Sequence, residues 1–168
     1  GGGGGGRGGG GRGGAGPRRG RRPDNCYRAR VLVFRMASIP ESHQDLFEKR
    51  TFAHFATLTP AGVPHVTPVW VDYDAAADRV LVNTARGRRK ERNVARDPRV
   101  GLSMLDPEDP YRYCSVVGEA TALTEDGADD HADALAGRYM GIDEYPNYDT
   151  DPGPRVVVEI RPDEVLTS

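Results

Sequence analysis

The feature that most constrains the fold is a series of six short segments rich in β-branched and aromatic residues, separated by turn residues or short helical patterns. Such side chains favour extended strands, and Gly, Pro, Asn and Asp favour the turns between them. Closing a small antiparallel sheet into a barrel removes its exposed edges. The sequence therefore predicts a mainly β fold, a six-stranded antiparallel barrel, with strands over 51–59, 63–73, 79–84, 99–105, 113–123 and 155–160.

Two prolines limit where segment 63–73 can lie in the sheet. Pro64 and Pro68 have no backbone N–H to donate, so we expect this strand at an edge or at a bulge.

Short helices are predicted between the strands. The first follows Ser38, which we expect to cap it, and Pro40, with Leu46 and Phe47 facing inward. The second covers 89–96 and stops before Pro98. The third covers 127–140, and one of its faces carries Ala132, Leu135 and Tyr139. Residues 141–154 are expected to form a long polar loop.

Composition divides the chain near residue 35. Residues 1–22 are almost wholly Gly and Arg, and 14 of the 22 glycines fall in the first 20 positions. Such a segment has nothing apolar to bury, so we expect residues 1–35 to form a disordered Gly/Arg-rich extension. Two interpretations remain open. One is an RGG-like nucleic-acid-binding tail, which the lack of interleaved aromatic residues disfavours. The other is sequence upstream of a true initiator at Met36.

Residues 36–168 are predicted to form the folded, cofactor-binding domain, and they are acidic. They carry 14 Lys and Arg residues against 24 Asp and Glu, a net charge of −10, whereas residues 1–35 carry +8. Five of those 14 basic residues lie within 86–92, where a predicted strand gives way to a helix. A helix N-terminus offers free N–H groups, Gly87 allows close backbone approach, and arginine forks suit phosphate. This junction is predicted to bind an anion; the alternative is a solvated basic face.

A second candidate feature is the strand over 65–70. Pro68 bends it and leaves a neighbouring carbonyl free, and Trp70 is the only tryptophan. A flat ring system fits against such a strand, with backbone groups facing its heteroatoms. The alternative interpretation places Trp70 in the core and His65 on the surface.

Other function classes find little support. The two cysteines, Cys26 and Cys114, are too few for a disulfide framework or a Cys-based zinc site, and the four histidines show no metal-binding spacing. No GxSxG nucleophile motif occurs, and no apolar run reaches the roughly 18 residues of a membrane span. We therefore expect a soluble cytoplasmic protein without a metal site, in which a bound cofactor supplies the chemistry.

Five stretches, in this order, resemble the pyridoxamine 5′-phosphate oxidase-like split barrels: ATLTPAGVPHVTPVWVDYD (56–74), VLVNTARGRRKERNVARDPRVGLSML (80–105), PYRYCSVVGEATAL (110–123), RYMG (138–141) and RVVVEIRPDEV (155–165). The chain looks closest to the F420-dependent branch. The most specific part is T-x-x-G-R-x-K-x-x-N-x-x-x-D-P-R-V at 84–100, and the resemblance covers nearly all of 41–167. It implies a six-stranded antiparallel split β-barrel, the FMN-binding split barrel, with a few short helices.

The resemblance also implies a function and a set of site residues. Members transfer a hydride between reduced F420 (or FMN) and a small, often conjugated, organic acceptor, at sites on the interface of a homodimer. The phosphate contacts carry over to Arg88 and Lys90, with Thr84, Arg89 and Asn93 nearby. The ring-lining strand carries over to Thr67, Pro68, Val69 and Trp70. No residue receives a catalytic role, and pyridoxamine phosphate is disfavoured as substrate because the chain stops soon after the last strand.

Alternatives remain open for the cofactor and for the class of function. F420 is expected over FMN, because its lactyl–oligoglutamate tail is polyanionic and Arg86, Arg89 and Arg92 exceed what one phosphate requires. The alternatives are an FMN-dependent oxidoreductase of the same group and a flavin- or tetrapyrrole-binding module without turnover. The expected partners are a second copy of the chain and a small-molecule substrate, with nucleic acid indicated by the Gly/Arg tail alone.

Overall fold

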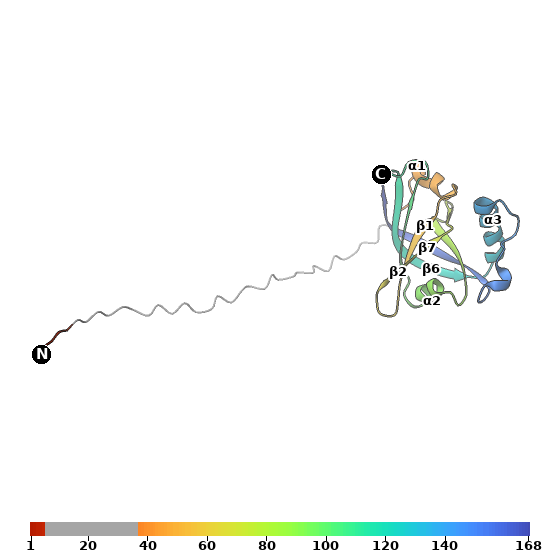
Figure 1. The fold of residues 1–168 in the computed structure, drawn as a ribbon. Coiled ribbons are helices and arrows are strands. Elements are labelled where there is room, and N and C mark those ends of the chain that lie inside the picture. The colour runs from red at the N-terminus through yellow and green to blue at the C-terminus, as the bar shows by residue number, and fades with distance from the viewer. Residues whose placement is uncertain (6–36) are drawn as a thin grey trace. The chain divides into compact units, whose positions relative to one another are not determined.

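The computed structural model describes residues 1–5 and 37–168 (Figure 1). The chain divides into two units, Gly1–Leu32 and Val33–Ser168, and the second contains every helix and strand of the described residues. Residues 1–5 are exposed and form neither helix nor strand. The expected Gly/Arg extension lies almost wholly outside the described residues, as do Cys26 and Met36, so these expectations stay predictions.

The second unit is built on one antiparallel sheet of seven strands in the order β2-β1-β5-β6-β7-β4-β3. The strands are β1 (Ala53–Leu58), β2 (Pro64–Val69), β3 (Asp72–Asp74), β4 (Arg79–Ala85), β5 (Arg99–Leu105), β6 (Tyr113–Thr124) and β7 (Arg155–Thr167). The proline-containing β2 lies at one end of this order, which confirms its predicted edge position.

The sheet is closed by the passage from β2 to β3. These strands follow one another in the chain but lie at opposite ends of the sheet order, and only Trp70 and Val71 separate them. Three Cα–Cα steps span at most about 11 Å, so the two edges must meet and the sheet must curl. This confirms the mainly β, antiparallel split barrel. Segment 63–73, predicted as one strand, is two strands because the chain changes sheet edge at Trp70.

Alternate strand residues fill the inside of the curl. On β1, Ala53, Phe55 and Thr57 are buried, and Ala53 and Phe55 lie opposite Val69 and Thr67 of β2. Such alternation is the pattern of a sheet with one face on the core. The largest fully buried side chains are Phe47, Phe55, Ile39, Leu46, Met104, Leu135, Ile160, Val71, Val80, Val82, Val116 and Val156.

The pairing of β6 with β7 continues past the predicted end of the last strand. The prediction ended that strand at residue 160, two residues before Pro162, which has no N–H to donate to a ladder. In the structure Pro162 pairs with Gly118 at a register shift next to Val117. A Cβ on Gly118 would lie 2.2 Å from the carbonyl oxygen of Arg161, so only glycine allows this close approach. The bulge therefore carries β7 past its proline.

Helices α2 (Arg89–Arg96) and α3 (Ala128–Met140) agree with the predicted segments. On α3, Ala132 and Leu135 are buried as expected. The predicted loop 141–154 contains one short 3-10 helix, η2 (Tyr148–Thr150).

The first helix is a short α-helix followed by a 3-10 helix, and its N-cap residue is not the predicted one. α1 (Glu41–Gln44) runs into the 3-10 helix η1 (Asp45–Phe47). The predicted Ser38 cap is wrong, because Pro40 is the N-cap residue and Ser38 Oγ donates to Asp78 Oδ2 at 2.8 Å. The two apolar residues predicted to face inward are buried: Leu46 and Phe47.

Helix α3 fastens the passage between β2 and β3. Tyr139 Oη donates to Thr51 O at 2.7 Å and accepts from the Val71 N–H at 3.3 Å. The Arg138 guanidinium donates to Asp72 Oδ1 at 3.1 Å and also to Val71 O at 3.3 Å. Side chains of one helix thus hold both sides of the closure.

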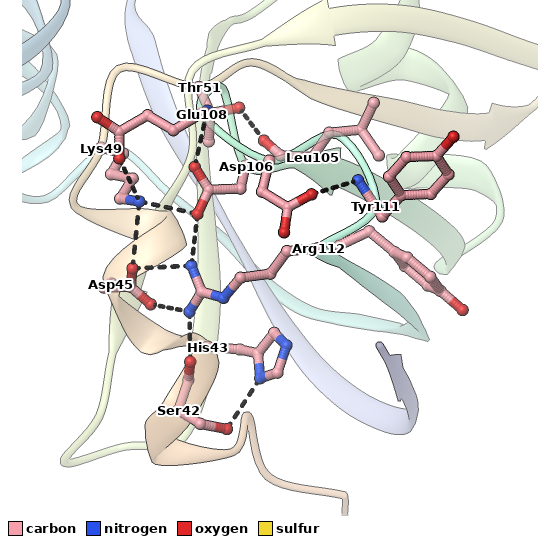
Figure 2. Close-up of polar contacts among 12 residues, drawn as sticks. Ser42, His43, Asp45, Lys49, Thr51, Leu105, Asp106, Glu108, Tyr111 and Arg112 are labelled. Atoms are coloured by element: carbon pink, nitrogen blue, oxygen red, sulfur yellow. Dashed lines mark hydrogen bonds and ion pairs between the residues drawn. The ribbon is translucent and has the colours of Figure 1, made fainter.

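A network of ion pairs ties η1 to the loop between β5 and β6 (Figure 2). Asp106, whose side chain is 5% exposed, accepts from Lys49 Nζ at 2.8 Å and from Arg112 at 2.6 Å. Arg112 also donates to both carboxylate oxygens of Asp45, at 2.5 and 3.0 Å. The hydrogen bond from Lys49, with those from the Glu108 N–H and Arg112, holds the pKa of the Asp106 carboxyl well below its usual range.

We expect Asp106→Asn to unfold at a lower temperature than the wild type at neutral pH, because Lys49 and Arg112 lose their shared carboxylate. Since folding lowers the pKa of Asp106, its contribution is fully present above the unfolded value near about 4 and is lost as the pH falls through the folded value. The difference in melting temperature should therefore shrink below about pH 4. Circular dichroism across this range measures it, with Asp109→Asn as the exposed control, and a pH-independent difference would contradict the assignment.

Candidate functional site

An open pocket of about 190 Å³ lies where β2 ends and the chain crosses to β3. Its lining comes from strands, helix ends and loops that are far apart in the sequence. The lining residues are Phe52, Pro68, Val69, Trp70, Asn83, Arg88, Lys90, Met140, Tyr145, Asn147 and Arg155. The lining combines a cluster of cations with a cluster of large apolar side chains.

The cationic cluster consists of Arg88, Lys90 and Arg155, and it shares one carboxylate. Asp151 pairs with Arg88 through one oxygen and with Arg155 through the other, the latter at 2.6 Å. Lys90 forms no ion pair with any described residue, and burial, followed by the charges of Arg88 and Arg155, lowers its pKa. Two positive charges are thus left without a counterion, which favours binding of an anion.

Arg155 is the most firmly held of the three cations, and the sequence analysis did not assign it to the site. Its side chain is 5% exposed, and its Nε donates to Asn83 Oδ1 at 2.7 Å. Its NH1 donates to Tyr145 Oη at 3.1 Å, and its guanidinium carbon lies 4.3 Å from the centroid of the Tyr145 ring. This combination of forked donors and ring stacking is specific to arginine.

The apolar cluster is built around stacked rings. Trp70 stacks on Tyr139 with centroids 5.2 Å apart and planes inclined by 14°, and it meets the Tyr145 ring edge-on at 6.1 Å. Phe52 and Met140 are 52% and 51% exposed at the mouth of the pocket. Tyr145 touches both clusters, so a ligand in this pocket would meet flat apolar surface on one part and cations on another.

The turn before α2 has a backbone conformation that requires its glycine. Gly87 has φ +81°, in the left-handed region that favours glycine. Its N–H donates to Glu91 Oε2 at 3.1 Å. Arg88 is the extended N-cap residue of α2, and no side chain caps this helix start. The positive end of the helix dipole therefore lies beside the cationic cluster.

The structure brings five of the nine predicted site residues onto the pocket lining: Pro68, Val69, Trp70, Arg88 and Lys90.

The other four predicted residues lie off the lining. The hydroxyls of Thr67 and Thr84 are buried and make no hydrogen bond within the described part of the chain. Asn93 is buried, and its Nδ2 donates to Thr57 Oγ1 at 3.0 Å, which anchors α2 to β1. Arg89 is exposed at the start of α2.

Of the three arginines expected to add charge for a longer anion, Arg86 differs from Arg89 and Arg92. Arg86 pairs with Glu91 at 3.1 Å and with Glu125 at 2.8 Å, so its charge is compensated and its expected contribution is wrong. Arg92 donates to Gly87 O and forms no ion pair with the described residues. Among the surplus arginines, Arg89 and Arg92 remain.

Six lining residues were missed by the sequence analysis: Phe52, Asn83, Met140, Tyr145, Asn147 and Arg155. One of them had a signal, because Arg155 directly precedes the apolar, buried run 156–158. A buried charge needs a partner, and that requirement alone pointed to a polar site there.

Other chemistries have a weak structural basis. Among residues 1–5 and 37–168, no group of three or more His, Cys, Asp or Glu side chains is arranged to hold a metal ion. Cys114 is buried, and burial raises its pKa to about 11, so its thiol is a poor nucleophile. No helix in the described part of the chain is both long and apolar enough to cross a membrane.

Known proteins share this fold. The family model for pyridoxamine 5′-phosphate oxidase matches residues 39–168. A solved F420 reductase is 31% identical, with a TM-score of 0.66 over 76% of this chain and 98% of that one. A conserved hypothetical protein from Mycobacterium tuberculosis is 23% identical, with a TM-score of 0.60 over 79% of this chain and 86% of that one. HupZ of Group A Streptococcus is 19% identical, with a TM-score of 0.56 over 77% and 93%. These last two show the shared fold alone.

If the cationic cluster binds a phosphate, Arg88→Ala and Lys90→Ala should each weaken binding of a phosphate-bearing flavin or deazaflavin by about 1.5–3 kcal/mol. Each change removes charged donors without leaving a large apolar cavity. Titration of cofactor fluorescence measures the dissociation constants, with Arg79→Gln as a control that removes a positive charge from β4 outside the pocket. Unchanged affinity in both pocket variants would show that the phosphate binds elsewhere.

Proposed function

The chain belongs to the pyridoxamine 5′-phosphate oxidase family, whose members are generally oxidoreductases, and on that premise we propose that it is an F420-dependent oxidoreductase. Its reaction would transfer a hydride between reduced deazaflavin and a small conjugated organic acceptor. The 31% identity with an F420 reductase, over nearly the whole of that chain, supports the choice of cofactor.

The observation that carries this proposal is the double character of the pocket. A flavin or deazaflavin is a planar tricycle joined to a phosphate, and the pocket offers stacked rings beside a cationic cluster. Lys90 has Arg88 and Arg155 as charged neighbours and pairs with no carboxylate of residues 1–5 and 37–168, so it is available as an anion ligand. The chemistry of these donors therefore fits a phosphate-bearing, flat cofactor.

The chain's own residues would bind the cofactor, orient its ring system and exclude water from the reacting face. Arg88, Lys90 and Arg155 would hold the phosphate, and the β2 end from Thr67 to Trp70 would lie along the ring system. When bound, the reduced cofactor supplies the hydride. The exposed side chains of Phe52 and Met140 would keep water from the reacting face, since both are large and apolar.

FMN is the second candidate cofactor, and one observation favours it. The cationic cluster has two uncompensated charges, and a phosphate monoester carries about −1.5 to −2 near neutral pH. The phosphate of F420 is a diester with one negative charge, so a match with F420 needs its anionic tail as well. Arg89 and Arg92, which form no ion pairs with described residues, are the groups available for that tail.

We also propose that the functional unit is a homodimer. On the outer face of the sheet, Val66 of β2 lies opposite Ala56, which lies opposite Gly101, which lies opposite Val117 of β6. Val66 and Val117 are 55% and 54% exposed, and no charged residue interrupts this row. A contiguous exposed apolar row of this kind marks an interaction surface, and a second copy of the chain would remove it from water.

The pocket supports a second copy as the occupant of that face. Pro68 lines the pocket and shares the outer side of β2 with Val66, because strand residues two apart face the same way. The proposed interface would therefore be continuous with the pocket. At about 190 Å³ the pocket of one chain is also smaller than the roughly 300 Å³ at which ligand pockets begin, so a partner would complete it.

Light scattering after size exclusion should give the mass of a dimer at micromolar concentration. Val117→Asp should shift the protein towards the monomer, because it places a charge at the exposed β6 end of the apolar row. Ala134→Asp, an exposed position on α3, serves as the matched control and should leave the dimer intact. A wild-type monomer at this concentration would rule the dimer out.

F420 should bind more tightly than FMN, and the difference should shrink as salt screens the tail. Arg89→Ser or Arg92→Ser should weaken F420 binding more than FMN binding, whereas Arg86→Ser, whose charge is already compensated, should not discriminate. Calorimetry at low and high salt measures both effects. If FMN binds more tightly at every salt concentration, the FMN alternative takes the place of F420.

Turnover is tested separately. Steady-state oxidation of reduced F420 with a panel of enones, quinones and biliverdin should identify at least one acceptor. Tight binding with no turnover on any acceptor would favour the non-catalytic module instead.

A further inference from the structure

A buried carboxylate lies inside the cationic cluster. The Asp151 side chain is 1% exposed, and its two oxygens accept from two different guanidinium groups, those of Arg88 and Arg155. Burying an unpaired carboxylate would cost several kcal/mol, so this pairing explains how the acid is tolerated. It does not explain why an anion-binding pocket contains an anion.

The two arginines depend on Asp151 to different degrees. Arg155 keeps Asn83 as an acceptor at 2.7 Å, and Tyr145 contacts it through both hydroxyl and ring. Among the described residues, the Arg88 side chain contacts only Tyr145 Oη, at 3.5 Å, besides Asp151, and it is 36% exposed. Without Asp151, Arg155 would keep its place and Arg88 would be free to leave the pocket.

The segment that carries Asp151 is itself fixed against the turn before α2. The Arg86 N–H donates to Pro154 O at 2.9 Å. A Cβ on Gly153 would lie 3.0 Å from Arg86 Cβ, so the two backbones are in close contact. Earlier in the same loop, the Tyr145 N–H donates to Asp133 Oδ1 of α3 at 2.8 Å. The carboxylate of Asp151 is therefore carried by a loop whose backbone is held in place.

We propose that Asp151 is a positioning residue of the anion site, and that it acts through Arg88. By occupying one edge of the guanidinium, it holds the remaining donors of Arg88 beside Lys90, where a phosphate would meet both. Pre-organised donors bind better than mobile ones because their ordering cost is already met in the free protein. The loop over 141–154 is thereby part of the anion site.

This role predicts an unexpected direction for the change in anion affinity when Asp151 loses its charge. If the site were governed by charge alone, removing a carboxylate from it would strengthen anion binding. If Asp151 positions Arg88, removing the carboxylate weakens anion binding although the pocket becomes more positive. Asp149 is exposed two residues earlier on the same loop, so Asp149→Asn removes an equal charge without touching either arginine.

The experiment compares Asp151→Asn with Asp149→Asn by fluorescence titration with F420 and with FMN. We expect about a ten-fold or greater loss of affinity for Asp151→Asn, on the scale of a lost hydrogen bond to a charged group. Asp149→Asn should change affinity less than about two-fold, toward tighter binding. Equal or tighter binding by Asp151→Asn would overturn the proposal.

A double-mutant cycle separates positioning from a general loss of structure. In an Arg88→Ala background, Asp151→Asn should have little further effect, because the residue through which it acts is gone. A full additive loss would overturn the proposal. If Asp151→Asn does not fold, Asp151→Glu decides, since it keeps the charge but moves the carboxylate by one methylene. Weaker binding would then support positioning, and unchanged binding would overturn it.

The inference rests on the proposed function only in taking the anion to be a cofactor phosphate. If the wild type binds neither F420 nor FMN, that function fails, and inorganic phosphate becomes the probe through its effect on the melting temperature. Stabilisation of the wild type and of Asp149→Asn, but not of Asp151→Asn, would still support the positioning role. No stabilisation of the wild type, or equal stabilisation of all three, would overturn it.

Discussion

The two-residue passage from β2 to β3 is the constraint on which the rest of the structure depends. Trp70 and Val71 carry the chain from one edge of the sheet to the other, so the sheet has to curl until its edges meet. The curl places the end of β2 near the start of β7 and near α2. It also explains why Tyr139 reaches Thr51 on one side and Val71 on the other. The pocket lies at this closure because there the ladder stops and side chains of several elements converge.

The electrostatics of the pocket follow from a local excess of positive charge within an otherwise acidic domain. Most basic side chains at the start of α2 could have been neutralised, as Arg86 is by Glu91 and Glu125. Instead Asp151 pairs with Arg88 and Arg155, and Lys90, which has no ion pair among the described residues, is partly desolvated beside these two positive neighbours. Repulsion among like charges destabilises the free protein. A bound anion would remove that repulsion, so the free energy of binding and the stability of this region are linked through the same charges.

The parts of the fold that local signals determine were predictable from the sequence. Helix α2 and strand β5 have the predicted bounds, because Pro98 separates them and their patterns are short and clear. The extension of β7 past Pro162 was not predictable, because it depends on a bulge at Gly118 in a different strand. The same holds for the site. Arg88, Lys90 and Trp70 stood in a recognisable pattern, whereas Tyr145 enters the pocket only through the folding of its loop. The sequence also did not indicate that Arg86 is neutralised, since Glu125, one of its two acidic partners, is distant along the chain.

The place of β7 in the sheet has a consequence for how the protein is made. This strand is the last in the sequence, yet it lies in the middle of the sheet order and joins β6 to β4. Until it emerges from the ribosome, β2-β1-β5-β6 and β4-β3 have no ladder between them, and β6 and β4 each present an unpaired edge. Unpaired edges are the sites at which nascent chains associate wrongly. The barrel can therefore be completed only once β7 has been made, and chaperones that shield strand edges would act on the chain before that point.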